Sequence, residues 1–200
     1  MISLCLMVRF KNERHILYEF IHHYIEEGVD HFLLLDDNST DDYLEVNKDW
    51  LQPLIDNNVV MIKATTKIQA REYNLHIEYL KSYDWTICVD MDEFMYSVEP
   101  NTTIKSLLCD KYSTYDWIHL IWRVFTHKCK DQPVSVIEDN KITHCKGKDP
   151  KTVDGKKNIF KTEHIKDIRI HDVKFNIKEK TLKVIDCHSK IIRNNHYRTQ

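Results

Sequence analysis

Short apolar runs alternate with amphipathic stretches along the first half of the chain. Four of the apolar runs have the length and composition of strands covered on both faces: Ile2–Val8, Phe32–Leu35, Val59–Ile62 and Trp85–Val89. Helices are predicted between them at Arg14–Glu27, Asp41–Leu51 and Ile68–Leu80. Strands and helices that alternate in this way predict an α/β domain with a mainly parallel central sheet flanked by helices.

The periodic pattern weakens after residue 103. One more helix is predicted at Ile104–Lys111, and further strands are predicted at Trp117–Val124, Asn158–Phe160, Ile168–Val173 and Leu182–Ile185. The polar stretch Thr126–Lys156 shows no sustained period, so we interpret it as a long functional loop or lid.

The composition suits one globular domain, because 42% of the 200 residues are hydrophobic and only three are Gly and four Pro. A net charge of −2 argues against nucleic acid as a partner. The apolar start meets Arg9 too soon for a transmembrane segment and lacks the features of a signal peptide. Six cysteines without CxxC spacing predict free thiols in a reducing compartment, the cytoplasm.

Polar clusters follow three of the predicted strands, at residues 9–13, 36–42 and 90–93. Parallel sheets bind ligands beyond the carboxyl ends of their strands, which is where these clusters fall. Asp90 and Asp92 stand at positions i and i+2, so both carboxylates can face one ligand. Oxygen ligands in an open site suit Mg²⁺ or Mn²⁺ bound together with substrate phosphates. The alternative is a surface turn or a helix N-cap, since short motifs often match by chance.

The acidic turn after the second strand offers a second ligand contact. Asp36 and Asp37 can accept hydrogen bonds from a base N–H or from ribose hydroxyls, a common task at such a loop. Asp41 and Asp42 are predicted to cap the next helix, where negative charge is favourable. The sequence contains no Gly-rich phosphate loop, which argues against P-loop and dinucleotide chemistry.

The order and spacing of these motifs resemble family 2-like and family 92-like glycosyltransferases. The segments that carry the resemblance are Val8-Arg-Phe-Lys-Asn-Glu13, Gly28-Val-Asp-His-Phe32, Asp36-Asp-Asn-Ser-Thr-Asp41 and Val89-Asp-Met-Asp-Glu-Phe94, with looser matches at Trp122-Arg-Val-Phe125, Lys157-Asn-Ile159, Ile170-His171 and Asn195-His-Tyr197. The resemblance implies a GT-A fold, a nucleotide-sugar donor, a divalent metal and transfer with inversion. It makes Asp92 the direct metal ligand and Asp90 a ribose or metal contact. Thr126 departs from the glycine that relatives often carry there.

The same resemblance implies roles for residues elsewhere. A late histidine is expected as a third metal ligand, with His171 and His196 as candidates. A carboxylate base is expected to deprotonate the acceptor hydroxyl, and the candidates are Asp154, Asp172 and Glu138. Nucleotide or phosphate contacts are expected from the remaining polar candidates: Arg9, Asn12, Glu13, Arg71, Arg123 and Lys157.

The sequence therefore predicts a metal-dependent glycosyltransferase that moves a hexose from UDP to a hydroxyl of a glycan or glycoconjugate. A metal-dependent nucleotidyltransferase or phosphohydrolase is the alternative, because paired carboxylates at a strand end also serve those reactions. A non-catalytic nucleotide-sugar-binding module is the second alternative. Residues 1–200 are predicted as one GT-A domain, with a nucleotide-binding half at 1–100 and an acceptor and metal-completing half at 101–200, and the chain is compatible with one module of a longer protein.

Overall fold

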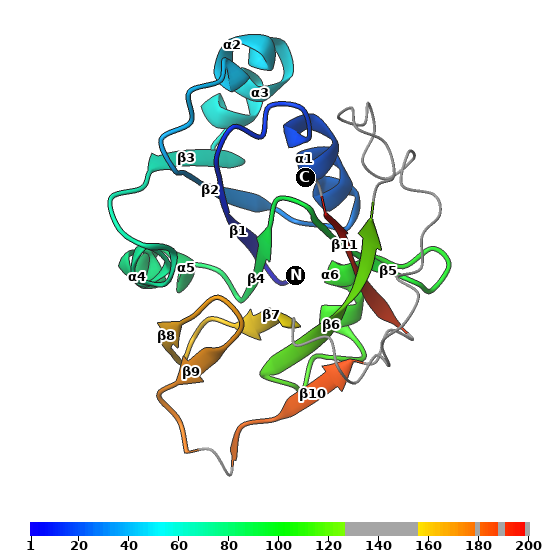
Figure 1. Cartoon of the computed structure of the whole chain (residues 1–200). Helices are drawn as coiled ribbons and strands as arrows, with labels where there is room; N and C mark the ends of the chain where they lie inside the picture. Colours follow the sequence, from blue (N-terminus) through cyan, green and yellow to red (C-terminus); the bar gives the residue numbers. More distant parts are fainter. Residues whose placement is uncertain (127–155, 179–180, 188–190, 199–200) are drawn as a thin grey trace.

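The computed structural model describes residues 1–126, 156–178, 181–187 and 191–198. Nine strands form one sheet, in the order β3-β2-β1-β4-β7-β6-β11-β5 with β10 beside β6 (Figure 1). Their bounds are β1 Leu4–Phe10, β2 His31–Asp36, β3 Val60–Ala64, β4 Trp85–Asp90, β5 Glu93–Ser97, β6 Trp117–Thr126, β7 Lys156–Lys161, β10 Val184–Cys187 and β11 Ile192–Arg198. In the described residues, no helix is both long and apolar enough to cross a membrane.

The first four strands form the parallel half of the sheet that the sequence predicts. Strand β1 lies between β2 and β4, and β3 adds to the outer side of β2. Strand β7 then runs antiparallel to both β4 and β6, and β5 runs antiparallel to β11, so the sheet is mixed but mostly parallel. Only Met91 and Asp92 join β4 to β5, although three other strands separate them in the sheet order. The sheet is therefore strongly curled.

Alternating side chains of the central strands build two apolar cores. In β1, Leu4, Leu6 and Val8 face one core, while Cys5 and Met7 face the other. The first core is covered by helices α1 (Leu17–Glu26), α3 (Lys48–Asp56) and α6 (Ile104–Cys109). The second is covered by α4 (Gln69–Leu75) and α5 (Ile77–Leu80) together with the hairpin of β8 (Ile165–Ile168) and β9 (Val173–Phe175). Burial on both faces explains why these strands are nearly continuous apolar runs.

Two predicted helices are divided. The predicted Asp41–Leu51 helix is a short α2 (Tyr43–Val46) followed by α3, which continues to Asp56. The predicted Ile68–Leu80 helix is interrupted at His76 between α4 and α5. Asp42 stands at the N-cap of α2, as the capping assignment predicts, but its side chain makes no cap hydrogen bond and pairs with the Arg14 guanidinium instead. Asp41 lies outside the helix, where its carboxylate accepts from the backbone amide of Arg14.

The second half of the chain departs further from the prediction. The segment Ile168–Val173, predicted as a strand, is instead the turn of the β8–β9 hairpin: β8 ends at Ile168 and β9 begins at Val173. The predicted strand Leu182–Ile185 begins two residues later, as β10. Strands β5 and β11 have no counterpart in the prediction, since polar side chains interrupt their apolar pattern. Of the predicted long loop, residues 127–155 lie outside the described residues.

Gly28 lies just after helix α1, in a backbone conformation that a side chain would disturb. Its φ is +90°, and an added Cβ would lie 2.6 Å from Cβ of Lys105. We expect Gly28→Ala to lower the free energy of unfolding by about 1–3 kcal/mol through backbone strain and overpacking. Urea unfolding measures the change. Asn58→Gly is the control, because it introduces a glycine at another position with positive φ, and it should leave the stability unchanged or slightly raised. A Gly28→Ala chain as stable as the parent chain would contradict the argument.

Candidate active site

A polar cleft of about 530 Å³ opens at the carboxyl ends of β1 and β4. Its charged and titratable lining comes from β1 and its following loop, the residue after β2, the end of β4 with the β4–β5 turn, and β11: Arg9, Lys11, Glu13, Asp37, Asp90, Asp92 and His196. The parallel half of the sheet thus brings together polar clusters that lie far apart in the sequence. This is the edge at which α/β sheets bind ligands.

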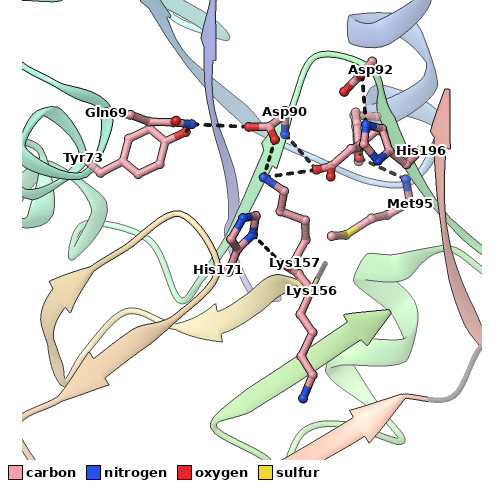
Figure 2. Close-up of polar contacts among 11 residues, drawn as sticks. Gln69, Tyr73, Asp90, Asp92, Met95, Lys156, Lys157, His171 and His196 are labelled. Carbon is pink, nitrogen blue, oxygen red and sulfur yellow. Dashed lines mark hydrogen bonds and ion pairs between the residues drawn. The ribbon is translucent and has the colours of Figure 1, made fainter. Parts of the chain in front are cut away.

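Asp90, the last residue of β4, is held from two sides (Figure 2). Nζ of Lys157 donates to Oδ2 of Asp90 at 2.6 Å. Nε2 of Gln69 lies 3.4 Å from Oδ1, a long contact, and also donates to the hydroxyl of Tyr73 at 2.7 Å. One oxygen of Asp90 is therefore taken by a cation, and the other is only weakly engaged.

Lys157 is a buried cation between two carboxyl groups. Its side chain is 1% exposed, and its Nζ lies 3.5 Å from Oε2 of Glu93, whose side chain is fully buried. Burial alone would lower the pKa of Lys157, but the charges of Glu93 and Asp90 reverse this effect and hold it above its ordinary value. Burial raises the pKa of Glu93 well above its ordinary range, against the opposing pull of Lys157. Oε1 of Glu93 has no hydrogen-bond partner.

Asp92 lies in the turn between β4 and β5 and faces β11 across the curled sheet. Its Oδ2 lies 3.1 Å from Nε2 of His196 (Figure 2). Its backbone oxygen accepts a hydrogen bond from the amide of Tyr197. The His196 ring packs against the indole of Trp122 with centroids 4.5 Å apart. Nδ1 of His196 and Nε1 of Trp122 are buried without hydrogen-bond partners. The pairing of β11 with β5 and β6 therefore sets the position of His196.

The two carboxylates of the acidic turn have different surroundings. Asp36 accepts from the amide of Ser39 at 2.8 Å and from the hydroxyl of Tyr43 at 3.2 Å, so both of its oxygens are used within the turn. Asp37 lines the cleft, where Nη2 of Arg9 lies 2.8 Å from its Oδ1. Hydrogen bonding from Arg9 holds the pKa of Asp37 below its ordinary value. Only Asp37 of this pair lines the cleft with Asp90 and Asp92.

Asn12 joins the loop after β1 to the acidic turn. Its φ of 56° is a left-handed conformation that Asn tolerates better than most residues. Its Oδ1 accepts from the amide of Thr40 at 2.7 Å, and its own amide donates to Oγ of Ser39 at 3.0 Å. Asn12 therefore shapes the rim of the cleft, and its side-chain oxygen is engaged within the protein.

Glu13 gives the cleft a pH-dependent charge. Burial raises its pKa to about 7, and the charges of Asp92 and Asp41 add to the rise. Because the folded pKa lies above the ordinary 4.5, the stability contributed by the protonated carboxyl is present below pH 4.5 and is lost as pH rises through 7. In the parent chain this loss lowers the free energy of unfolding by on the order of 3 kcal/mol between pH 4.5 and pH 7, and we expect Glu13→Gln to abolish it. Urea unfolding of both chains at several pH values measures this, and parallel pH curves would contradict it.

The other sequence candidates do not line the cleft or fall outside the described residues, although the ring of His171 packs edge-on against Trp122 with centroids 5.5 Å apart. Arg71 is exposed on α4, and His171 is exposed in the β8–β9 turn, where its Nδ1 lies 3.1 Å from the backbone oxygen of Lys156. Asp172 lies in the same turn. Arg123 is partly buried on β6. Asp154 and Glu138 fall in 127–155, and the side chain of Thr126 is likewise outside the described part of the chain.

Sequence reasoning gave no role to Gln69, Glu93 or the ring of Trp122. Gln69 carries no recognisable signal, because its place at Asp90 depends on how α4 packs beside β4. Glu93 belongs to the polar cluster after β4, and its full burial is visible only in the structure. Trp122 stands in one of the looser motif matches, and its contact with His196 depends on the pairing of β6 with β11.

The donor atoms at Asp92 and His196 suit an open site for Mn²⁺ or Mg²⁺. They offer a carboxylate oxygen and an imidazole nitrogen that meet at 3.1 Å beside the cleft. In the part of the chain that the structure describes, no three His, Cys, Asp or Glu side chains form a ready metal cage. The residues present therefore fit an ion whose remaining positions are filled by water and substrate oxygens, as Mg²⁺ usually is.

Comparisons with solved structures find glycosyltransferases at low sequence identity. S. aureus TarS 1-349 in complex with UDP-GlcNAc matches with a TM-score of 0.52 and 12% identity, over 99% of this chain and 60% of that one. The UDP complex of the same protein matches with 0.50 and 13%, over 80% and 47%. The mannosyltransferase PcManGT from Pyrobaculum calidifontis, in complex with GDP-Man and Mn²⁺, matches with 0.47 and 16%, over 61% and 36%. The chain thus spans at most 60% of the length of each of these three structures.

The TarS matches support the fold, an α/β arrangement with a mixed, mostly parallel and curled sheet like that of GT-A glycosyltransferases. No curated protein sequence matches the chain significantly. The family model of Glycosyltransferase family 92 matches residues 1–200, in agreement with the motifs at the strand ends. The chain therefore belongs to glycosyltransferase family 92.

Proposed function

We propose that this chain transfers a hexosyl group from a UDP-sugar to a hydroxyl of a glycan or glycoconjugate, with a divalent metal and with inversion. One observation carries the proposal: Asp37, Asp90, Asp92 and His196 line a single cleft at the carboxyl ends of parallel strands. Family 92 membership supports glycosyl transfer as the reaction class. TarS, which shares the fold, holds UDP and UDP-GlcNAc in its structures, and this favours UDP as the nucleotide.

In this proposal the two sides of the cleft have different tasks. Asp37, fixed by Arg9, accepts from the base or ribose of the nucleotide, and Asn12 maintains the shape of the loop around it. Asp92 and His196 would hold the divalent ion, which when bound would supply positive charge against the diphosphate leaving group. A carboxylate that removes the acceptor proton stays a prediction among Asp154, Asp172 and Glu138.

Family membership favours this function over a nucleotidyltransferase or phosphohydrolase, both of which also place metals between carboxylates. A non-catalytic binding module would hold the donor without turnover. A reducing, cytoplasmic location, suggested by the scattered thiols, is likewise proposed.

A screen of sugar nucleotides, each with Mn²⁺, with Mg²⁺ or with EDTA, tests the function. We expect slow donor hydrolysis for one or more UDP-hexoses, dependent on the metal, and faster release of UDP when a suitable acceptor glycan is added. Binding of UDP-sugars without turnover under all acceptor conditions would favour the binding module. Cleavage that releases a sugar phosphate and UMP in place of UDP would favour the hydrolase.

A further inference from the structure

Lys157 places a permanent positive charge directly behind the cleft. It comes from β7, the antiparallel strand inserted between β4 and β6, so its long side chain reaches the end of β4 through the protein interior. Its ammonium is 2.6 Å from Asp90 and 3.5 Å from Glu93, and 5.9 Å from the ring centre of Trp122. With 1% of its side chain exposed, Lys157 is inaccessible to a substrate phosphate. Its partner in the cleft is therefore Asp90.

The two aspartates are consequently unequal as metal ligands. Oδ2 of Asp90 already contacts an ammonium, and a divalent ion placed there would meet the positive charge of Lys157 at close range. In the part of the chain that the structure describes, Asp92 forms no ion pair with Lys157, and its Oδ2 instead lies 3.1 Å from Nε2 of His196. Its side chain is 23% exposed, and Asp92 and His196 both line the cleft.

We propose that Lys157 is a positioning residue: its ammonium holds Asp90 and keeps a divalent ion away from it. Lys157 would thereby enforce the roles that the family resemblance implies for the two aspartates, with Asp90 toward the donor and Asp92 toward the ion. The assignment rests on the proposed function, because it takes the nucleotide-sugar and its metal as the occupants of the cleft. Among the described residues, Oδ1 of Asp90 is engaged only by the 3.4 Å contact with Gln69, so it is the oxygen that remains for a donor hydroxyl.

Binding of Mn²⁺ at saturating UDP, followed by electron paramagnetic resonance, tests this division without relying on turnover. We expect Asp92→Asn to weaken Mn²⁺ binding tenfold or more and Asp90→Asn to change it less than threefold, although the two substitutions are chemically identical. Equal losses in the two variants would overturn the assignment.

The role of Lys157 is tested with variants that lack its ammonium group. Lys157→Met alone leaves two carboxyl groups facing each other and can fail to fold, so Lys157→Met/Glu93→Gln is used, which removes the ammonium together with the buried carboxyl group that faces it. We expect this variant to bind Mn²⁺ at least fivefold more tightly, because Asp90 is released to join Asp92. Adding Asp90→Asn to this double variant should return the Mn²⁺ affinity to that of the unaltered chain. An unchanged or weakened affinity in Lys157→Met/Glu93→Gln, with the fold intact by circular dichroism, would overturn the proposal.

Failure of the proposed function gives a different result. If the unaltered chain binds no Mn²⁺ at saturating UDP, the metal of the proposed function is rejected, and the division of the aspartates with it. If the unaltered chain binds Mn²⁺ and hydrolyses a UDP-sugar, but both aspartates are needed equally for the metal, the function stands and only the role of Lys157 is rejected.

Discussion

Asp92→Asn is expected to reduce the rate of glycosyl transfer at least about 100-fold while the chain remains folded. The change keeps the shape of the side chain but removes the charge that faces His196 in the cleft. A metal supplies several kcal/mol of charge stabilisation in the transition state, and about 3 kcal/mol corresponds to 100-fold in rate. The measurement is the initial rate of UDP release at saturating donor and Mn²⁺.

Asp56→Asn is the matched control for that experiment. Asp56 is an exposed carboxylate at the end of α3 that accepts a hydrogen bond from Gln52, away from the cleft. Its replacement should leave the rate unchanged, and the urea unfolding midpoints of both variants should stay close to that of the parent. Full activity in Asp92→Asn, with the control also active, would show that the cleft described here is not the reaction centre.

Lys157→Met should have the largest effect on stability. The substitution keeps an unbranched side chain, shorter by one heavy atom, but leaves Asp90 and the buried Glu93 without their shared counter-charge. Removing one partner of a buried ion pair typically costs 3–5 kcal/mol, since the remaining charge stays in a poorly solvating environment. We expect a loss of about that size in the free energy of unfolding, measured in urea at pH 7.

Two further variants separate the charge effect from a packing effect. Lys157→Met/Glu93→Gln should recover part of the loss, because only Asp90, which reaches the cleft, then keeps its charge. Lys81→Met removes a cation from the Lys81–Glu78 pair on the surface, and exposed pairs contribute about 0–1 kcal/mol. A Lys157→Met chain that is no less stable than Lys81→Met would mean that the buried ammonium does not balance these carboxyl groups.

The positions of the first four strands and of α1 could be predicted from the sequence, because they depend on local patterns. Continuous apolar runs mark strands buried on both faces, and helical spacing marks the side of a helix that meets a core. Asp37, Asp90 and Asp92 could be selected as candidates for a related reason, since a polar cluster directly after a buried strand falls at the carboxyl edge of a parallel sheet, and all three line the cleft. The places of these strands, of α1 and of these aspartates can be predicted because they depend on the residues next to them in the sequence.

The remaining parts of the site depend on contacts between distant segments. The pairing of β11 with β5 brings His196 to Asp92, whereas His171 lies in a hairpin turn, and no local pattern separates these two histidines. The insertion of β7 beside β4 brings the ammonium of Lys157 to Asp90, 67 positions earlier in the chain. The sequence by itself determined which strand ends carry the acids. Only the tertiary structure decided which side chains meet them, because that choice depends on strand order and register across the curled sheet.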